Sequence, residues 1–558
     1  MYILGITSGG ESGAALFENE RLICAVNEER LTRKKRDDSY PFNSIKWCIE
    51  KAGFRYDQIA LICYGFSNGV RQGTFLTNLF DKAITSAHGT EASKIIRERL
   101  ISENEIDSKK RHDCYTRTRE LFPNTQIYWC YHHAAHSANA FVSSPFDNAL
   151  VITADGRGDF QSLTISDASR EEIKEIFCQY SWESIGYFYG RITYLCGFKP
   201  NNHEGKITGL AAKGNPYKAL GFINKIVSME NGAIKFHLGD YYRPFFSNYS
   251  KTIIEEAALY SKEDLAAAAQ YQLEKIICSL ISEYINKTGL NSICLSGGVF
   301  SNVKLNQRIR EMDEVSDVFI YPNMSDAGLC TGAVYSWFMH KKYKFVPSPH
   351  SLYVGPEIDP EEAAILLRDN GITVRKTSNL IDDVISMIAD KKIIGLIQGK
   401  TEFGPRALGN RSILSTTAYP ELTDIINKRL NRDNFMPFAP AIAAELAPRC
   451  LKRYSLNTLS NRHMTLSFDA TEEFCTNSPA VVHVDNTTRA QIVWPEDNKF
   501  LHQLLIRWYE KTGGLSLLNT SFNMHEDPII STIRDVQGII DNKMVDALVF
   551  PPYIAIIN

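Results

Sequence analysis

A strand–turn–strand pattern occurs twice in this chain, once in YILGITSGGESGAALFENERLICAVNEER and again in NALVITADGRGDFQSLTISDA. In each copy an apolar strand leads into a small, glycine-rich polar turn and then into a returning strand. Such turns can aim backbone N–H groups at a phosphate, although a tight hairpin is the simpler explanation of either copy alone. The repetition predicts a duplicated α/β core.

The length of the chain, 558 residues, is too great for one hydrophobic core. The stretch KFVPSPHSLYVGPEIDPEEAA contains four prolines and no hydrophobic periodicity, which is typical of a connection between domains. We expect a first domain over residues 1–345, a linker over 346–356 and a second domain over 357–558.

Charge and cysteine usage narrow the class of protein. The net charge of −3, from 61 basic and 64 acidic residues, gives no global electrostatic reason to expect a nucleic-acid partner. The 12 cysteines are scattered without a CxxC pair, which favours reduced thiols. The N-terminus does not resemble a secretion signal, and no apolar run reaches 18 residues. We therefore expect a cytoplasmic protein that does not cross a membrane.

Three histidines lie within five positions in the stretch YWCYHHAAHSANAF. Alanine-rich flanks favour a helix, on which His132 and His136 would lie one turn apart on the same face while His133 points elsewhere. Alone, such a pair is as compatible with capping or packing as with a metal. Asp155 ends an apolar strand, and Asp326 stands where it or its neighbour can cap a helix. Together the four form a mixed N/O ligand set that suits Fe(II), Mn or Zn.

Several loops carry groups that bind anions. Gly297 and Gly298 follow a short apolar strand and precede a helix, which favours a nucleotide phosphate or ribose, although close backbone packing also explains them. In the second domain, EFGPRALGNR and LNTSFN each follow a strand and offer guanidinium, amide and hydroxyl donors. The basic run from Arg33 to Arg36 is followed by two aspartates, which favours a solvated loop over a phosphate contact.

Ten motifs, in order along the whole chain, resemble those of the ATP-dependent O-carbamoyltransferases of antibiotic and nodulation-factor biosynthesis. They are VNEERLTRKK, HHAAH, TADGRGD, EGKITGLAAKG, LSGGVFSN, SDAGLCTGA, QGKTEFGPRALGNRSIL, MPFAPAI, HVDNTTRAQIV and LNTSFNMHEDPI. The resemblance implies an α/β fold with an N-terminal duplicated domain of the actin and sugar-kinase type. The C-terminal α/β domain would be similar to threonylcarbamoyl-adenylate synthase.

The resemblance also implies a reaction. The C-terminal domain would form carbamoyl-adenylate from carbamoyl phosphate and ATP with Mg, and the N-terminal domain would transfer the carbamoyl group to a small-molecule acceptor. An adenylate is a good leaving group, and a metal, with Fe(II) expected first, can polarise the carbonyl. The acceptor is open, a homodimer is compatible with the sequence, and no membrane partner is implied.

Residue roles are carried over from the resemblance alone. The family's metal ligands fall on His132, His136, Asp155 and Asp326. Its nucleotide-facing positions fall on Lys206, Gly297, Gly298 and Asn302. Its carbamoyl phosphate and adenylate positions fall on Arg406, Arg489, Asn519, Ser521 and Asn523, with the two arginines also in the catalytic set. For Arg411, in the same motif as Arg406, we expect no such role and only the stabilisation of its loop.

The chain departs from the family pattern at three positions. Gly10 stands where the family has a histidine that deprotonates the acceptor hydroxyl, so Glu11 or His133 could act instead, the acceptor could be an amine, or transfer could be impaired. Leu430 and Met436 replace a common lysine and arginine near the donor, although Lys428, Arg429 and Arg432 are close in sequence. Two competing hypotheses are tRNA threonylcarbamoylation and a degenerate, non-catalytic nucleotide-binding relative.

Overall fold

The computed structural model describes residues 1–67, 81, 90–230, 233–244, 249–343, 351–432, 438–455 and 458–557. The chain divides into two compact units. Unit 1 contains Met1–Ile23 and Asp38–Pro349, and unit 2 contains Cys24–Asp37 and His350–Asn558. The chain therefore passes between the units three times. Residues 346–350 of the expected linker lie outside the described residues, and the remainder contributes to strand β13 (Tyr353–Glu357) of unit 2.

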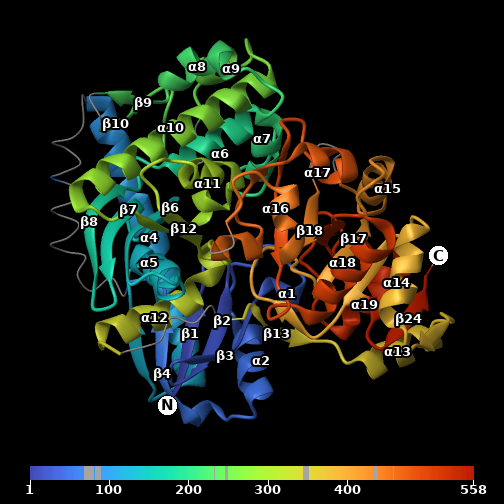
Figure 1. Ribbon diagram of the computed structural model, residues 1–558. Coiled ribbons are helices and arrows are strands. Elements are labelled where there is room, and N and C mark those ends of the chain that lie inside the picture. Colours follow the sequence, from blue (N-terminus) through green and yellow to red (C-terminus); the bar gives the residue numbers. More distant parts are fainter. Residues whose placement is uncertain are drawn as a thin grey trace. The chain divides into compact units, whose positions relative to one another are not determined.

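Unit 1 contains two five-stranded sheets with the same arrangement of strands (Figure 1). The first has the order β3 (Arg21–Asn27), β2 (Gly13–Glu18), β1 (Tyr2–Thr7), β4 (Ile59–Tyr64), β5 (Gln126–Trp129). The second has the order β8 (Ile173–Tyr180), β7 (Gln161–Ser169), β6 (Asn148–Gly158), β11 (Ser292–Ser296), β12 (Asp317–Ile320). In both sheets the central strand pairs antiparallel with its hairpin partner and parallel with a later strand. The predicted duplicated α/β core is thus confirmed.

Helices cover these sheets because their strands are apolar on both faces. Helix α12 (Leu329–His340) packs against β1 and against α5 (His132–Val142). A Cβ atom on Gly5 would lie 1.8 Å from the Cys330 carbonyl oxygen, so this glycine permits the close approach of helix and strand. The remaining helices of unit 1 are α2 (Phe42–Ala52), α4 (Thr90–Leu121), α6 (Ile185–Leu195), α7 (Glu204–Ala211), α8 (Pro216–Asn224), α9 (Lys251–Ala257), α10 (Lys262–Thr288) and α11 (Val303–Arg310). A small hairpin joins β9 (Val227–Glu230) to β10 (Ala233–Phe236).

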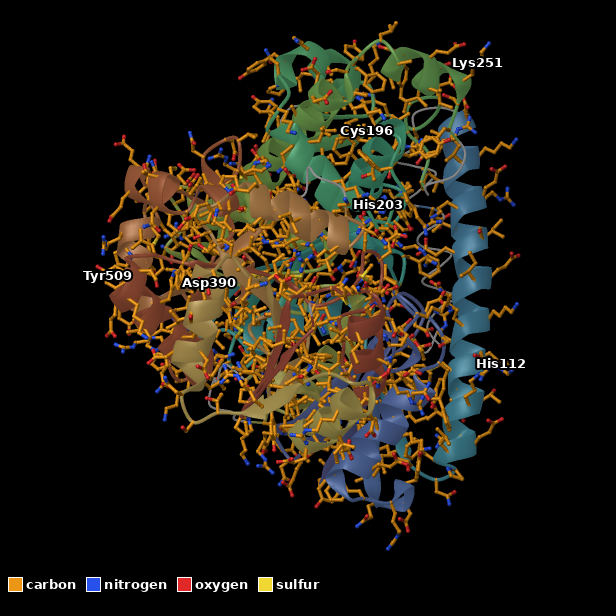
Figure 2. The ribbon with its side chains drawn as sticks, turned by 90° about the vertical axis from the view of Figure 1, so that its right-hand side faces the viewer. His112, Cys196, His203, Lys251, Asp390 and Tyr509 are labelled. Atoms are coloured by element: carbon orange, nitrogen blue, oxygen red, sulfur yellow. The ribbon has the colours of Figure 1, made fainter. Side chains whose placement is uncertain are left out.

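Local sequence signals explain the ends of the long helices. Helix α10 begins at Ser261, whose hydroxyl accepts from the Asp264 amide at 3.1 Å, and ends at Gly289 with φ +74°. Helix α4 buries Ile96 and Leu100 against Phe160 and Trp182. Its opposite side is exposed, as His112 shows in Figure 2. An amphipathic pattern therefore accounts for a helix that is rich in charge.

Unit 2 is built on an eight-stranded mixed sheet. Its order is β14 (Val374–Lys376), β24 (Tyr553–Ile556), β23 (Ala547–Phe550), β15 (Ile394–Ile397), β17 (Arg411–Thr416), β22 (Leu517–Ser521), β18 (Ala439–Ala443), β21 (Gln491–Val493). Two strand pairs complete it, β13 with β16 (Lys400–Glu402) and β19 (Phe468–Asp469) with β20 (Thr487–Thr488). Its helices are α1 (Glu29–Thr32), α13 (Pro360–Asp369), α14 (Leu380–Ala389), α15 (Glu421–Arg429), α16 (Ala447–Cys450), α17 (Glu472–Asn477), α18 (Lys499–Thr512) and α19 (Ile533–Asp541).

All 12 cysteines are free thiols. Among the described residues, no helix combines the length and the apolar character that crossing a membrane requires.

The loop before α6 contains a carboxylate whose ionisation opposes folding. Burial raises the pKa of Glu183 from its ordinary 4.5 to about 7. Below 4.5 the group is protonated in both the folded and the unfolded chain, so the folded state loses stability only as the pH rises from there through 7. Glu183→Gln should therefore leave stability nearly unchanged at pH 4.5 and raise it by about 3 kcal/mol at pH 8. Urea unfolding at the two pH values measures this, and an equal effect at both would contradict it.

Candidate functional site

Helix α5 presents two histidines to the interior of unit 1. His132 and His136 are 6% and 0% exposed, and their ring centroids lie 4.8 Å apart. The start of the helix is fixed by Asp159, whose carboxylate accepts from the His132 backbone N–H at 2.8 Å. A Cβ on Gly158 would lie 2.1 Å from the His132 ring, so only glycine leaves room for that ring at the end of β6. The four-residue spacing on α5 and the contacts with Asp159 and Gly158 together orient the imidazoles of His132 and His136.

Two aspartates complete the cluster from other elements. Asp155 lies on β6, and Asp326 lies in the short turn that leads to α12. The Nε2 atom of His132 lies 3.4 Å from Asp326 Oδ1, while His136 Nε2 lies 3.5 Å from Asp155 Oδ2 and 3.6 Å from Asp326 Oδ1. Donor atoms of all four residues lie within 4.8 Å of one another. The structure thus brings together the four residues predicted as metal ligands.

The chemistry of these atoms fits a divalent cation. His132 Nε2, His136 Nε2 and Asp326 Oδ1 are buried and have no hydrogen-bond partner among the described residues. Buried polar atoms without partners are costly, and a bound ion would satisfy all three at once. Ligands that hold one ion at about 2 Å lie roughly 3 Å from each other, close to the separations seen here. Two imidazoles with two carboxylates suit Fe(II), Mn or Zn.

The protonation of the cluster agrees with this interpretation. Burial by itself would lower the pKa of His136, but the carboxylates of Asp155 and Asp326 outweigh it and raise that pKa to about 9. Burial would likewise raise the pKa of Asp155, but hydrogen bonding and the charge of His136 lower it. The two carboxylates therefore favour a positive charge at His136, which a bound cation would supply instead.

Neighbouring groups orient the ligands. His136 Nδ1 lies 3.0 Å from the Ser296 hydroxyl, and the Gly156 and Gly298 amides donate to the Asp155 carboxylate at 2.7 and 3.0 Å. Gly297 has φ +102°, and a Cβ there would lie 2.2 Å from the Ala154 carbonyl oxygen. Gly297 and Gly298 thus serve close packing and the support of Asp155, and their role in nucleotide binding stays a prediction.

The two other predicted nucleotide positions have contacts of their own. Lys206 on α7 is 6% exposed, and its ammonium lies 5.5 Å from the centroid of the Phe198 ring. The side chain of Asn302 caps α11 by accepting from the Leu305 amide at 3.0 Å and donates to Gln270 at 2.8 Å. These contacts position both side chains, and nucleotide binding by either stays a prediction.

Three arginines of unit 2 lie close together. Arg406 stands on the loop between β16 and β17, Arg489 between β20 and β21, and Arg432 beyond α15. Burial lowers the pKa of Arg489 well below its usual range, and the charges of Arg406 and Arg432 lower it further. Burial also lowers the pKa of Arg406, and lowers that of Arg432 to about 10. Among the described residues, no carboxylate forms an ion pair with any of the three.

This three-arginine cluster has the character of an anion site. The Nε atoms of Arg406 and Arg489 are buried without a hydrogen-bond partner in the described part of the chain. Arg432 donates to the Thr520 hydroxyl at 2.6 Å, and its guanidinium lies 4.9 Å from the centroid of the Phe438 ring. Like charges held close together and partly shielded from water repel, and a bound phosphate would compensate them through bidentate hydrogen bonds. The sequence indicated Arg406 and Arg489, whereas the place of Arg432 depends on its packing against Thr520 and Phe438.

Three polar residues on β22 or just beyond it, Asn519, Ser521 and Asn523, have different surroundings. Asn519 donates to Gln491 at 2.7 Å and keeps a buried Oδ1 that none of the described residues contacts by a hydrogen bond. Ser521 is half-buried at the end of the strand. Asn523 donates to the Met524 and Asp527 carbonyls at 2.6 and 3.0 Å and so closes its own turn. Binding of donor or adenylate by these three residues stays a prediction.

Comparison with known proteins identifies the family. Residues 2–335 match the model of the carbamoyltransferase N-terminus, and residues 385–556 match that of the carbamoyltransferase C-terminus. The chain belongs to the carbamoyltransferase family.

Relatives of this carbamoyltransferase cover almost its whole length. An uncharacterised protein of Methanocaldococcus jannaschii is 31% identical over 99% of each chain. The nodulation protein NolNO of Sinorhizobium fredii is 27% identical over 98% of this chain and 78% of that protein. Among solved structures, component A of (R)-2-hydroxyglutaryl-CoA dehydratase from Acidaminococcus fermentans covers 62% of this chain and 100% of its own, with 13% identity and a TM-score of 0.33. Family membership supports a transferase activity.

Three positions bear on how this carbamoyltransferase departs from the family pattern. A Cβ on Gly10 would lie 2.2 Å from Asp326 Oδ2, so a side chain at this position would displace a predicted ligand. Glu11, next to it, accepts a hydrogen bond from the Ser325 hydroxyl. His133 is 1% exposed, its Nδ1 lies 2.7 Å from the Thr153 hydroxyl, and burial keeps its pKa well below the usual range. Of the two proposed substitutes for the missing histidine, Glu11 therefore has the more suitable surroundings.

The other positions lie in unit 2. Leu430 is fully buried, and Met436 lies outside the described residues. Arg411 donates to the carbonyls of Pro356, Gln398, Gly399 and Asn410, in agreement with its expected role in stabilising the loop.

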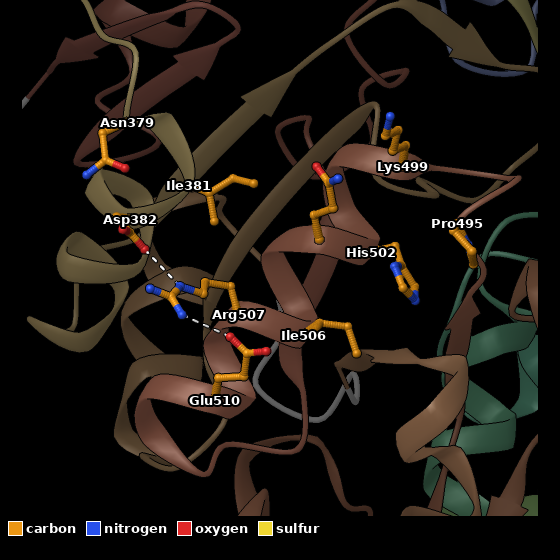
Figure 3. Close-up of a pocket in the computed structure, with 10 residues that line it drawn as sticks. Asn379, Ile381, Asp382, Pro495, Lys499, His502, Ile506, Arg507 and Glu510 are labelled. Atoms are coloured by element: carbon orange, nitrogen blue, oxygen red, sulfur yellow. Dashed lines mark hydrogen bonds and ion pairs between the residues drawn. The ribbon is translucent and has the colours of Figure 1, made fainter.

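A groove on unit 2 lies outside the three-arginine cluster. It runs between α14 and α18 and is lined by Ile381, Ile506 and charged side chains (Figure 3). Arg507 there already pairs with Asp382 at 3.3 Å and with Glu510 at 3.0 Å. None of the lining residues belongs to the metal cluster or to the three-arginine cluster.

Proposed function

We propose that this carbamoyltransferase activates carbamoyl phosphate with ATP in unit 2 and transfers the carbamoyl group in unit 1 to a hydroxyl or amine of a small-molecule acceptor. The observation that carries the proposal is the three-arginine cluster. Three half-buried guanidinium groups, none of which pairs with a carboxylate among the described residues, suit a strongly anionic ligand, and the family supplies the identity of the transferred group. Carbamoyl phosphate meets both requirements.

The proposed activation step consists of two reactions. Carbamoyl phosphate loses its phosphate to water as inorganic phosphate, and the carbamate oxygen forms a bond to the α-phosphorus of ATP while pyrophosphate leaves. The product is carbamoyl-adenylate. Arg406, Arg432 and Arg489 would hold the phosphate and compensate the negative charge that develops on it. Arg432 would supply the charge that is missing at Leu430.

In the transfer step the acceptor oxygen or nitrogen bonds to the carbamoyl carbon, the bond to AMP breaks, and the acceptor proton leaves to a base. A divalent cation held by His132, His136, Asp155 and Asp326 would supply Lewis acidity at the carbonyl. We assign the base to Glu11, whose carboxylate lies beside Ser325 and therefore near Asp326. Fe(II) is the metal we would test first, and Lys206 and Asn302 are the nucleotide contacts we would test in unit 1.

The experiment that tests this function is pyrophosphate release from ATP by purified protein. We expect release that requires carbamoyl phosphate and continues without an acceptor, with AMP and carbamoylated product appearing only when Fe(II) and an acceptor are added. Absence of pyrophosphate under all conditions, with candidate acceptors present, would exclude the carbamoyl-adenylate route and leave a non-catalytic binding protein. Salt-sensitive tRNA binding would instead point to threonylcarbamoylation.

A further inference from the structure

The segment Cys24–Asp37, which we call the anchor segment, belongs to unit 2 although it lies near the N-terminus. Its helix α1 has only four residues, too few to be stable without tertiary contacts. Even so, Asn27, Glu28 and Arg30 are buried, with exposures of 6%, 1% and 3%. Burying these polar side chains, at the end of β3 and at the start of α1, is costly unless other groups contact them.

Arg30 makes one of these contacts with the loop that carries Arg406. Its Nη2 donates to the Gly404 carbonyl oxygen at 2.7 Å, and its Nε lies 3.8 Å from Glu29. The other end of that loop is fixed by Glu402, whose carboxylate accepts from the amides of Leu408, Asn410 and Arg411 at 2.7, 2.8 and 3.2 Å. Loop 403–411 is thus held at both ends by charged groups, with Arg406 between them.

Arg33 attaches the anchor segment at a second place. Its guanidinium donates to the carbonyls of Pro528 and Ile529 at 2.7 and 2.9 Å and pairs with Asp535 at 2.9 Å. The basic run predicts a solvated loop, whereas the Arg33 guanidinium is bonded to other residues of unit 2. With two arginines bonded to backbone carbonyls, the anchor segment is a fixed part of unit 2.

We propose that Arg30 is a positioning residue for the anion site, because it holds Gly404 and thereby keeps Arg406 directed toward Arg489 and Arg432. The proposal rests on the proposed function, since the anion in question is the donor. Arg30 itself does not contact the donor. Its loss should therefore weaken donor binding through the geometry of loop 403–411 and leave ATP binding much less affected.

The test uses the full-length protein and four variants. Arg30→Met should raise the KM for carbamoyl phosphate on the order of tenfold in pyrophosphate release, with kcat and the KM for ATP changed by less than about threefold. Arg30→Lys, which keeps the charge, should recover part of the loss. Lys34→Met removes a charge from the same segment at a side chain that is 64% exposed, and should change nothing. Arg489→Met removes a direct ligand and should abolish donor binding.

Direct binding of carbamoyl phosphate, followed by calorimetry, and hydrogen exchange at the Leu408 and Asn410 amides complete the experiment. Faster exchange in Arg30→Lys is expected even if Arg30→Met proves too unstable to assay. If Arg489→Met loses donor binding while both Arg30 variants keep the wild-type KM and exchange rates, the positioning role is refuted and the proposed function stands. If wild-type protein neither binds carbamoyl phosphate nor releases pyrophosphate, the proposed function fails and the positioning role with it.

Discussion

Replacing His136 by asparagine should abolish carbamoyl transfer while pyrophosphate release in the absence of acceptor continues. His136 Nε2 approaches both Asp155 and Asp326, so its loss removes the ligand at the centre of the cluster. We expect the affinity for Fe(II) to fall by more than about 100-fold and transfer by on the order of 10³-fold. Metal content after dialysis and the yield of carbamoylated acceptor measure the two effects.

Two variants control this experiment. His112→Asn makes the same substitution at an exposed histidine on the outer side of α4 and should change neither quantity (Figure 2). Ser296→Ala removes only the partner of His136 Nδ1 and should lower metal affinity by an intermediate factor, about 10-fold. Transfer by His136→Asn at the wild-type rate would show that the cluster takes no part in the reaction.

Replacing Arg489 by methionine should abolish donor activation and, at the same time, stabilise the ligand-free protein. The charges of the half-buried Arg406 and Arg432 oppose that of Arg489, so removing one charge relieves repulsion and desolvation. We expect pyrophosphate release to fall by at least about 10³-fold and stability without ligand to rise by about 1 kcal/mol. Loss of stability together with activity would indicate a structural arginine instead.

Thermal unfolding with and without phosphate separates the two effects. The wild type should gain stability when inorganic phosphate is added, and Arg489→Met should not. Arg432→Met should also lower pyrophosphate release, but by a smaller factor. One N–H group of Arg432 donates to Thr520, so the wild-type guanidinium has fewer donors left for the donor phosphate. Arg449→Met, in an exposed ion pair with Glu473, is the control and should leave release unchanged.

The parts of the fold that follow from local pattern were predictable. The repeated hairpins predicted the duplicated sheets because continuous apolar runs and glycine-rich turns act within a few residues. The helical spacing of His132 and His136 placed them on one face of α5. These relations need no knowledge of distant packing.

The parts that depend on distant packing were not predictable. Arg432 joins the other arginines because Phe438 and Thr520 hold its guanidinium. His133 bonds to Thr153 on the neighbouring strand, and no periodicity indicates which hydroxyl will lie there. The charges of the basic run from Arg33 to Arg36 predict a solvated loop, because nothing in the sequence near Arg33 indicates the carbonyls of Pro528 and Ile529 that accept its hydrogen bonds.

The division of unit 2 into two separate stretches of chain has a consequence for recombination. A single crossover between two related genes at the proline-rich stretch would join the α1 of one parent to the loop 403–411 of the other. Chimaeras that exchange residues 24–37 together with residues 350–558 would keep Arg30 and Arg33 with the backbone carbonyls of the same parent that accept their hydrogen bonds. Engineered exchange of unit 2 therefore needs three junctions, and natural mosaics of this family should show linked inheritance of the two stretches.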